Sequence, residues 1–340
     1  MPATDNATAR WGLSPAAAAL HADALVWDNT VPWSGFGRAE LKAQALAHHI
    51  GAGADFVSVT VATDGHSVAQ TIEILGQERA YFLSDPSRFR LCETVDDILA
   101  AKAAGLLGVN FHFQGTNAFA RDVGLVEIYY KLGVRHALMA YNQKNHVGDG
   151  CHERTDGGLS RFGVALIQEM NRVGMMVDCS HTGYRTAMET LEHSTAPVIF
   201  SHSNAKALHD HPRNITDDQI DACARTGGVI GVNGIGVFLG GNDASTERYL
   251  QHVDYLVQRV GPAHVAIGLD WVYDMDSLMA EVRKSAATYP DGAYNLVINV
   301  AQPEQLPEIT DGLLRRGYSE DDVRAILGLN WVRVARSVWK

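Results

Sequence analysis

The sequence predicts an α/β fold, a (β/α)8 TIM barrel, and three observations support this class. Eight short apolar runs of strand-like length recur along the 340 residues. Helical segments separate most of these runs, which is the pattern of parallel strands joined by crossover helices. No linker-like change of composition divides the chain, so we expect one domain over residues 1–340. The strand candidates are residues 24–27, 56–61, 107–113, 136–140, 175–178, 198–200, 228–232 and 265–269.

Helical patterns fill most intervals between these runs. Residues 1–13 form a loose lead-in, and Ser14-Pro15 then resembles an N-cap followed by the first helical residue. At the other end, residues 303–340 carry amphipathic helices, interrupted near Gly317 and Gly328, that should pack on the outside of the barrel. The remaining helices are expected at 38–49, 67–83, 95–104, 121–131, 159–173, 217–225 and 246–260.

The composition restricts the class of partner. With 28 basic and 39 acidic residues the formal net charge is −11, and the basic residues do not cluster. Such a chain is a poor match for nucleic acid or an anionic membrane, so we expect a small-molecule substrate. No apolar run approaches the roughly 20 residues of a membrane span, and the N-terminus has no secretory pattern. The four scattered cysteines favour reduced thiols and a cytoplasmic location. The oligomeric state stays open, with a homodimer as one option.

Two of the apolar runs end in the same dipeptide, at Ser180-His181 and Ser201-His202. Because a helix-sized connection lies between them, both histidines should follow neighbouring parallel strands. In a barrel, that places them at the carboxyl-terminal face, where catalytic residues lie. Two imidazoles held side by side on rigid strands suit a borderline metal such as zinc. The alternative is a pair of hydrogen-bonded core histidines.

Further polar residues follow other predicted strands. Asp270 ends the eighth run and is a candidate base for a metal-activated water, the alternative being a turn aspartate. Arg213 follows the sixth run and could hold a substrate carboxylate, the alternative being a surface ion pair. The polar loop at 143–158, which contains Asn145, is typical of an active-site loop that contacts substrate. Other strand-end residues are Asp28, Gln114 and Tyr141.

Three other histidines have simpler interpretations. His112 lies two residues before Gln114 and so faces the same barrel interior, where a core histidine is favoured over a replacement ligand. His146 and His152 lie in the long polar loop, where solvated side chains are favoured over substrate contacts.

Several of these segments resemble motifs of the membrane (renal-type) dipeptidases. The resemblance implies a TIM barrel of the amidohydrolase superfamily and a metal-dependent hydrolase. It covers most of the chain, with the motifs in the family's order. The matching segments are Gly133-Val134-Arg135, 158–163, Met170-Asn171-Arg172-Val173-Gly174, Asp178-Cys179-Ser180-His181, Ser201-His202-Ser203, 213–218, Gly268-Leu269-Asp270 and 317–330.

The chain departs from the family pattern at three places. Asp28-Asn29-Thr30 stands where the family has the His-x-Asp pair that binds one zinc ion. Gln114 aligns with the family's bridging glutamate, and Tyr141 aligns with its substrate-contacting histidine. The His-x-Asp at His21-Ala22-Asp23 lies before the first strand, and we interpret it as unrelated to the site.

These departures change the expected metal content. Two divalent cations close together need negative ligands to offset their repulsion, and neutral Gln114 supplies none. We therefore expect one zinc ion, or another divalent metal, on His181 and His202, with Gln114 or Asp28 as a weak third ligand. Fold-level analogy with superfamily deacetylases that use one metal and a strand-eight aspartate points the same way.

The leading hypothesis is a cytoplasmic metallohydrolase that cleaves an amide bond in a dipeptide or an N-acyl amino acid. The metal would polarise the carbonyl and supply hydroxide, Asp270 would shuttle the proton, Arg213 would hold a carboxylate and Tyr141 would support the oxyanion. A second hypothesis keeps the site but changes the substrate to another small amide, lactam or betaine-like metabolite. A third is a metal-poor binding or scaffold protein with degenerate catalysis.

Overall fold

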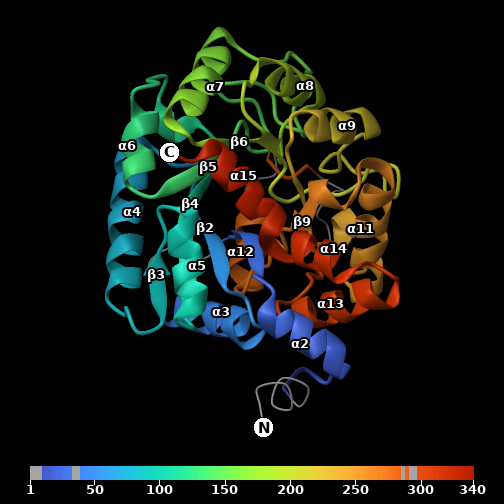
Figure 1. Cartoon of the computed structure of the whole chain (residues 1–340). Helices are drawn as coiled ribbons and strands as arrows, with labels where there is room; N and C mark the ends of the chain where they lie inside the picture. Colours follow the sequence, from blue (N-terminus) through green and yellow to red (C-terminus); the bar gives the residue numbers. More distant parts are fainter. Residues whose placement is uncertain (1–9, 33–38, 285–287, 291–296) are drawn as a thin grey trace.

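The computed structural model describes residues 10–32, 39–284, 288–290 and 297–340. Parallel strands lie at the centre of the molecule, and helices surround them (Figure 1). The lead-in at 1–9 and the first residue of the helix predicted at 38–49 lie outside the described residues. None of the helices in the described ranges has the length and apolar character needed to cross a bilayer.

All of the strand pairings are parallel, and their order follows the chain. One sheet has the order β1-β2-β4-β5-β6-β7, and β8 pairs with β9. A bridge between Phe200 and Ile230 joins the two sheets, and the Leu269 amide donates to the Asp28 carboxylate at 2.9 Å, which links β9 to β1. The strands are β1 Trp27–Val31, β2 Phe56–Thr63, β3 Phe89–Leu91, β4 Leu107–Gln114, β5 Val134–Leu138, β6 Met176–Asp178, β7 Val198–Ile199, β8 Ile230–Val232 and β9 Val265–Ile267.

The predicted (β/α)8 barrel is confirmed, with three differences in its strands. β1 starts at Trp27, so Asp28, Asn29 and Thr30 lie within the strand instead of following it. β5 begins at Val134, earlier than predicted. The short strand β3 was not predicted; it pairs with the start of β4 beside the run of eight. A three-residue strand is too short to show an apolar alternation that a sequence pattern can detect.

The predicted helices are present, and the helices at 236–239 and 275–284 were not predicted. The Ser14 hydroxyl accepts from the Ala17 amide at 3.3 Å, so the predicted N-cap is present. The helices are α2 Pro15–Asp23, α3 Ala39–Gly51, α4 Val68–Leu83, α5 Val95–Ala103, α6 Leu125–Lys131, α7 Arg161–Val173, α8 Tyr184–His193, α9 Asp217–Arg225, α10 Gly236–Leu239, α11 Thr246–Val260, α12 Met275–Lys284, α13 Gln305–Arg315, α14 Glu320–Arg324 and α15 Asn330–Val338.

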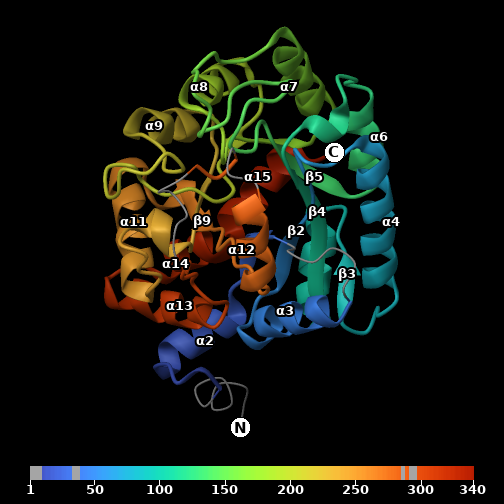
Figure 2. The same cartoon turned by 180° about the vertical axis from the view of Figure 1, so that it is seen from behind.

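The C-terminal helices cover the amino-terminal end of the barrel. Trp331 of α15 is fully buried and packs against Trp27, the first residue of β1, with ring centroids 6.5 Å apart. Its indole nitrogen donates to the Ile267 carbonyl at 3.0 Å. Figure 1 shows α15 in front of the strands, and the opposite view brings α12 forward (Figure 2). The two helices therefore lie on opposite faces, and the carboxyl-terminal face is on the α12 side.

The prediction of two helix interruptions is half right. Gly317 ends a helix with a left-handed φ of 84°. Gly328 does not interrupt the helix, because α14, the π-helical turn Ala325–Leu329 and α15 follow without a break. A Cβ at residue 328 would lie 2.3 Å from the Leu25 carbonyl oxygen. This glycine is required for close packing against the chain before β1, a role that sequence does not distinguish from helix termination.

Candidate active site

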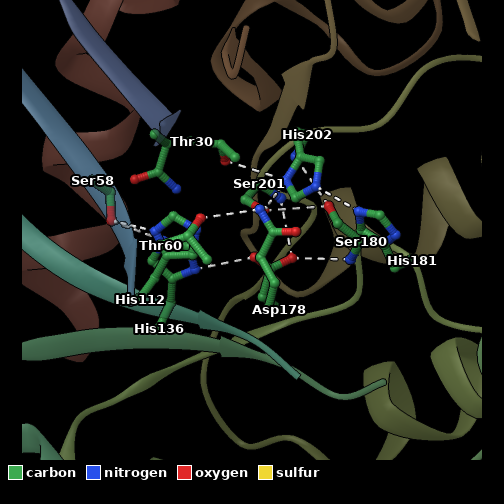
Figure 3. Close-up of polar contacts among 12 residues, drawn as sticks. Thr30, Ser58, Thr60, His112, His136, Asp178, Ser180, His181, Ser201 and His202 are labelled. Atoms are coloured by element: carbon green, nitrogen blue, oxygen red, sulfur yellow. Dashed lines mark hydrogen bonds and ion pairs between the residues drawn. The ribbon is translucent and has the colours of Figure 1, made fainter. Parts of the chain in front are cut away.

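His181 and His202 face each other at the ends of β6 and β7 (Figure 3). Their Nε2 atoms are 3.0 Å apart, and the ring planes make an angle of 63°. Both side chains are almost completely buried. Burial, followed by the positive charge of Arg213, lowers the pKa of each imidazole well below its usual value. Both rings are therefore neutral at pH 7, which is the form that binds a metal.

A single carboxylate holds the two strand ends together. Asp178, the last residue of β6, accepts from the Ser180 amide at 2.9 Å and from the Ser201 amide at 3.1 Å. The Ser180 hydroxyl in turn accepts from the His202 amide at 3.0 Å. His181 has a φ of 63°, a left-handed conformation that residues other than glycine rarely adopt. These hydrogen bonds fix the backbone where the two rings meet.

The outer nitrogen of each imidazole has its own partners. His181 Nδ1 lies 2.6 Å from Asn142 Oδ1, and the Tyr141 ring stacks on the imidazole with centroids 4.3 Å apart. His202 Nδ1 lies 2.7 Å from the Ser201 hydroxyl and 3.2 Å from the Thr30 hydroxyl. Orientation of a ligating histidine through its second nitrogen is typical of metal sites.

Asp270 follows β9 and carries the properties of a proton-transfer group. It is nearly fully buried, with a left-handed φ of 57°, and its Oδ2 accepts from Asn233 Nδ2 at 2.9 Å. Burial raises the pKa of its carboxyl to about 7, against the lowering effects of Arg213 and the Asn233 hydrogen bond. Such a carboxyl can both take and return a proton near neutral pH.

Arg213 is buried, and its partners are few. Nη2 donates to the His202 carbonyl at 3.1 Å, and the guanidinium lies over the Phe238 ring with 5.1 Å to the centroid. Within the described ranges, its buried Nε has no hydrogen-bond acceptor. The positive charge of Arg213 also lowers the pKa values of His181, His202 and Asp270. The surface ion pair considered from sequence therefore does not describe this residue.

Asp28 and Gln114 are both buried, and the structure gives each a partner. Asp28 Oδ1 accepts from the Leu269 amide at 2.9 Å, and Oδ2 lies 3.2 Å from His49 Nε2. Gln114 Nε2 donates to the Thr60 hydroxyl at 3.1 Å. Their assignment as weak third ligands stays a prediction.

Tyr141 and Asn145 occupy different surroundings. The Tyr141 hydroxyl lies 2.6 Å from the Tyr289 hydroxyl, in addition to the ring contact with His181. Asn145 Nδ2 contacts Asp64, Thr116 and the Met139 carbonyl, all at 2.9 Å. Its Oδ1 accepts from the Val147 and Gly148 amides at 2.7 and 3.2 Å. These contacts order the loop at 143–158, and substrate contact by Asn145 stays a prediction.

Three other histidines that the sequence analysis considered have partners of their own. His112 stacks on His136 at 4.4 Å and contacts the Ser58 and Thr60 hydroxyls at 2.9 and 2.8 Å, as a core histidine does (Figure 3). His21 lies in α2, bound to Thr310 and the Ala52 carbonyl. His152 is partly buried, and burial lowers its pKa to about 4, so the solvated loop histidine expected here is wrong.

Two supporting asparagines were missed by the sequence analysis. Asn142 contacts His181, and Asn233 contacts Asp270. Asn142 is fully buried with a φ of 60°. Asparagine tolerates the left-handed region better than most residues. An asparagine directly after a predicted strand was the available signal for Asn142, but nothing in the pattern separates it from an ordinary turn residue.

The histidine pair fits one divalent cation. Zinc–imidazole bonds are about 2.0–2.1 Å long, so two nitrogens on one tetrahedral ion lie roughly 3.3 Å apart. The observed separation of 3.0 Å is close to this value. In the part of the chain that the structure describes, no group of three or more His, Cys, Asp or Glu side chains could hold a metal. A single ion on the two imidazoles therefore stays a prediction, compatible with their separation.

The fold and this site together define a barrel hydrolase of the amidohydrolase type. Residues 38–285 match the family described as membrane dipeptidase (peptidase family M19). The chain is 33% identical over 241 residues to dipeptidase verJ of Clonostachys rogersoniana, covering 70% of this chain and 56% of that protein. It is 31% identical to an uncharacterised protein of Klebsiella pneumoniae, covering 79% of this chain and 97% of that one.

A solved structure resembles the whole fold. An amidohydrolase from Pseudomonas aeruginosa superposes with a TM-score of 0.87 at 32% identity, covering 95% of this chain and 99% of that one. The chain therefore belongs to the membrane dipeptidase family. The resemblance inferred from the motifs is confirmed.

Proposed function

We propose that this chain hydrolyses the amide bond of a dipeptide, or of a similar small N-acyl amino acid, with one divalent cation on His181 and His202. The observation that carries the proposal is the pair of neutral, buried imidazoles with Nε2 atoms 3.0 Å apart. Zinc is the expected ion, because neutral imidazole is a favourable ligand for it. When bound, zinc would act as a Lewis acid on the scissile carbonyl and lower the pKa of the attacking water.

The chain's own residues supply the remaining steps. Asp270, with a pKa of about 7, takes the proton of the attacking water and passes it to the leaving amine. Arg213 binds the substrate carboxylate, and its buried Nε is a donor without an acceptor in the described residues. The Tyr141 hydroxyl donates to the oxyanion that forms at the carbonyl. A cytoplasmic location agrees with the four free cysteines.

A substrate panel tests this proposal against its rivals. Purified full-length protein, loaded with zinc or manganese, is assayed with dipeptides, N-acetyl amino acids, lactams and betaine-like amides. Turnover of dipeptides or N-acyl amino acids that is lost on chelation supports the proposal. Turnover restricted to substrates without a carboxylate would reject the role of Arg213. Less than stoichiometric metal after loading, with no turnover, would favour a binding protein with degenerate catalysis.

A further inference from the structure

The amide of Asn142 connects His181 with a distant segment of the chain. Its Oδ1 lies 2.6 Å from His181 Nδ1, and its Nδ2 donates to the Thr288 carbonyl at 3.2 Å. Thr288 also donates from its hydroxyl to Gln143 Oε1 at 3.1 Å, and Tyr289 meets Tyr141. Thr288 and Tyr289 therefore lie against the residues that contact the His181 ring.

The orientation of the Asn142 amide follows from its partners. A backbone carbonyl can only accept, so the Thr288 carbonyl requires the NH2 group of Asn142. The Cys151 thiol contacts the other side of the amide, with Sγ 3.5 Å from Oδ1. A thiol donates through its S–H group, so this contact also fits the amide oxygen as acceptor. Both partners place the carbonyl oxygen of Asn142 toward His181.

This orientation determines the tautomer of His181. The amide oxygen only accepts, so His181 Nδ1 must carry the proton that it receives. A neutral imidazole with a proton on Nδ1 has its lone pair on Nε2. Nε2 of His181 is therefore the nitrogen that would be free to bind a cation.

His202 has no such constraint. Among the described residues, its Nδ1 contacts the Ser201 and Thr30 hydroxyls, and a hydroxyl can donate or accept. Without a cation, His202 can donate from Nε2 to the lone pair of His181 across the 3.0 Å gap. With a cation, the proton can lie on Nδ1 and bond to a hydroxyl, which frees the second lone pair. The contacts therefore fix the tautomer of His181 but not that of His202, although each histidine is the second residue of a Ser-His dipeptide.

We propose that Asn142 is a positioning residue that fixes His181 as the Nδ1–H tautomer, that the Thr288 carbonyl fixes the amide, and that His202 alone changes tautomer when the cation binds. The use of this arrangement rests on the proposed function, but the tautomer itself does not. Residues next to a metal ligand typically change metal affinity by roughly 10–100-fold when their contact is removed.

The test measures tautomers and affinity on the full chain. Long-range 1H–15N correlation spectra of cation-free protein identify the protonated nitrogen of His181, assigned by the loss of its signals in His181→Gln. Zinc affinity is measured by competition with a chromophoric chelator. Asn142→Leu removes the acceptor, and Asn142→Asp keeps an acceptor but removes the donor to Thr288. Gln143→Ala is the matched control, because it removes a neighbouring contact with Thr288 and none with His181.

The expected results separate loss of the contacts from Thr288 through Asn142 to His181 from general damage to the loop. Wild type and Gln143→Ala show His181 protonated on Nδ1, and zinc moves the proton of His202 alone. Asn142→Leu loses the single tautomer and weakens zinc binding by roughly 10–100-fold, while Asn142→Asp, which keeps the acceptor, keeps His181 protonated on Nδ1. A proton on Nε2 of His181 in the wild type would overturn the inference, whatever the Asn142 variants show. If the wild type shows the expected tautomer but binds no zinc, the proposed function is rejected, whereas the inference about the His181 tautomer still holds.

Discussion

Arg213 donates from Nη2 to the backbone carbonyl of His202 at 3.1 Å, so one proposed metal ligand also anchors the guanidinium. This hydrogen bond fixes the distance between the cation site and the group that would bind the substrate carboxylate. A substrate held at both places has its scissile bond in a defined position between them. Such positioning is the main contribution that a rigid barrel makes to hydrolysis.

Replacement of Arg213 by lysine should weaken substrate binding. Lysine keeps the charge but cannot form the paired hydrogen bonds of a guanidinium, and a lost hydrogen bond to a charged group corresponds to roughly 10–100-fold in KM. Steady-state kinetics on a dipeptide and on its C-terminal amide provide the measurement. Only the free acid should respond to the substitution. Arg259→Lys, which changes a surface pair with Asp221, is the control, and equal losses on both substrates would contradict the role assigned to Arg213.

Replacement of Asp270 by asparagine should abolish most activity without removing the cation. A positioned general base typically contributes roughly 10²–10⁴-fold, and the amide cannot take a proton. Measurement of kcat beside zinc content distinguishes this outcome from loss of the metal. An Asp270→Asn variant with near wild-type kcat would show that another group moves the proton.

The same variant should also change how stability depends on pH in cation-free protein. The pKa of Asp270 rises from 3.8 to about 7 on folding. The stability that its protonated carboxyl contributes to the folded state is therefore fully present below pH 4 and is lost as the pH rises through 7. Asp270→Asn removes this loss and should be more stable than wild type at pH 8, on the order of 2–4 kcal/mol. Denaturant unfolding with chelator at pH 5 and pH 8 provides the comparison. An identical pH dependence in both proteins would mean that Asp270 does not titrate near neutrality.

Replacement of Gln114 by glutamate should strengthen cation binding. Gln114 is buried at the end of β4 and supplies no charge, whereas a carboxylate there would offset the repulsion between two cations. We expect the zinc content to rise from one ion toward two per chain, measured by elemental analysis after gel filtration. Gln114→Met controls for the lost contact with Thr60. Unchanged content and affinity in Gln114→Glu would place residue 114 outside the influence of the ion.

Replacement of Gly328 by alanine should destabilise the barrel. The added Cβ would lie 2.3 Å from the Leu25 carbonyl, and such overpacking typically costs about 1–3 kcal/mol. Gly76→Ala in α4 is the matched control, because its Cβ meets nothing within 4 Å and alanine is the better helix former. Thermal unfolding of both variants gives the comparison. Equal stability of Gly328→Ala and wild type would mean that the π-helical turn Ala325–Leu329 and the chain before β1 can separate at little cost.

The sequence predicted the barrel well because its signals are local and repeated. Apolar runs bounded by glycine or proline mark β2 and the strands from β4 to β9, and the repeated Ser-His follows two of them. The bounds of β1 were wrong because three polar residues in a row, Asp28-Asn29-Thr30, lie inside this buried strand, whereas a polar run usually signals that a strand has ended. The role of Gly328 could not be predicted, because it depends on contact with a residue about 300 positions away.

The site was predicted only in part, for a related reason. Residue type and strand position are enough to nominate His181, His202, Asp270 and Arg213. The side chains that contact these residues come from elsewhere in the chain, as Asn142 does for His181 and Asn233 for Asp270. No local pattern distinguishes such an asparagine from a turn residue, so these partners are found only when the chain is folded.

Equilibrium zinc titration of the wild type and of the His181→Ala/His202→Ala variant tests the central claim most directly. The account predicts that each wild-type chain binds one zinc ion and that the double variant binds none specifically. The double variant should also lose hydrolysis. The double variant should keep its circular dichroism spectrum, so that lost binding is not lost folding. Stoichiometric zinc or undiminished hydrolysis in the folded double variant would contradict a cation held by these two imidazoles.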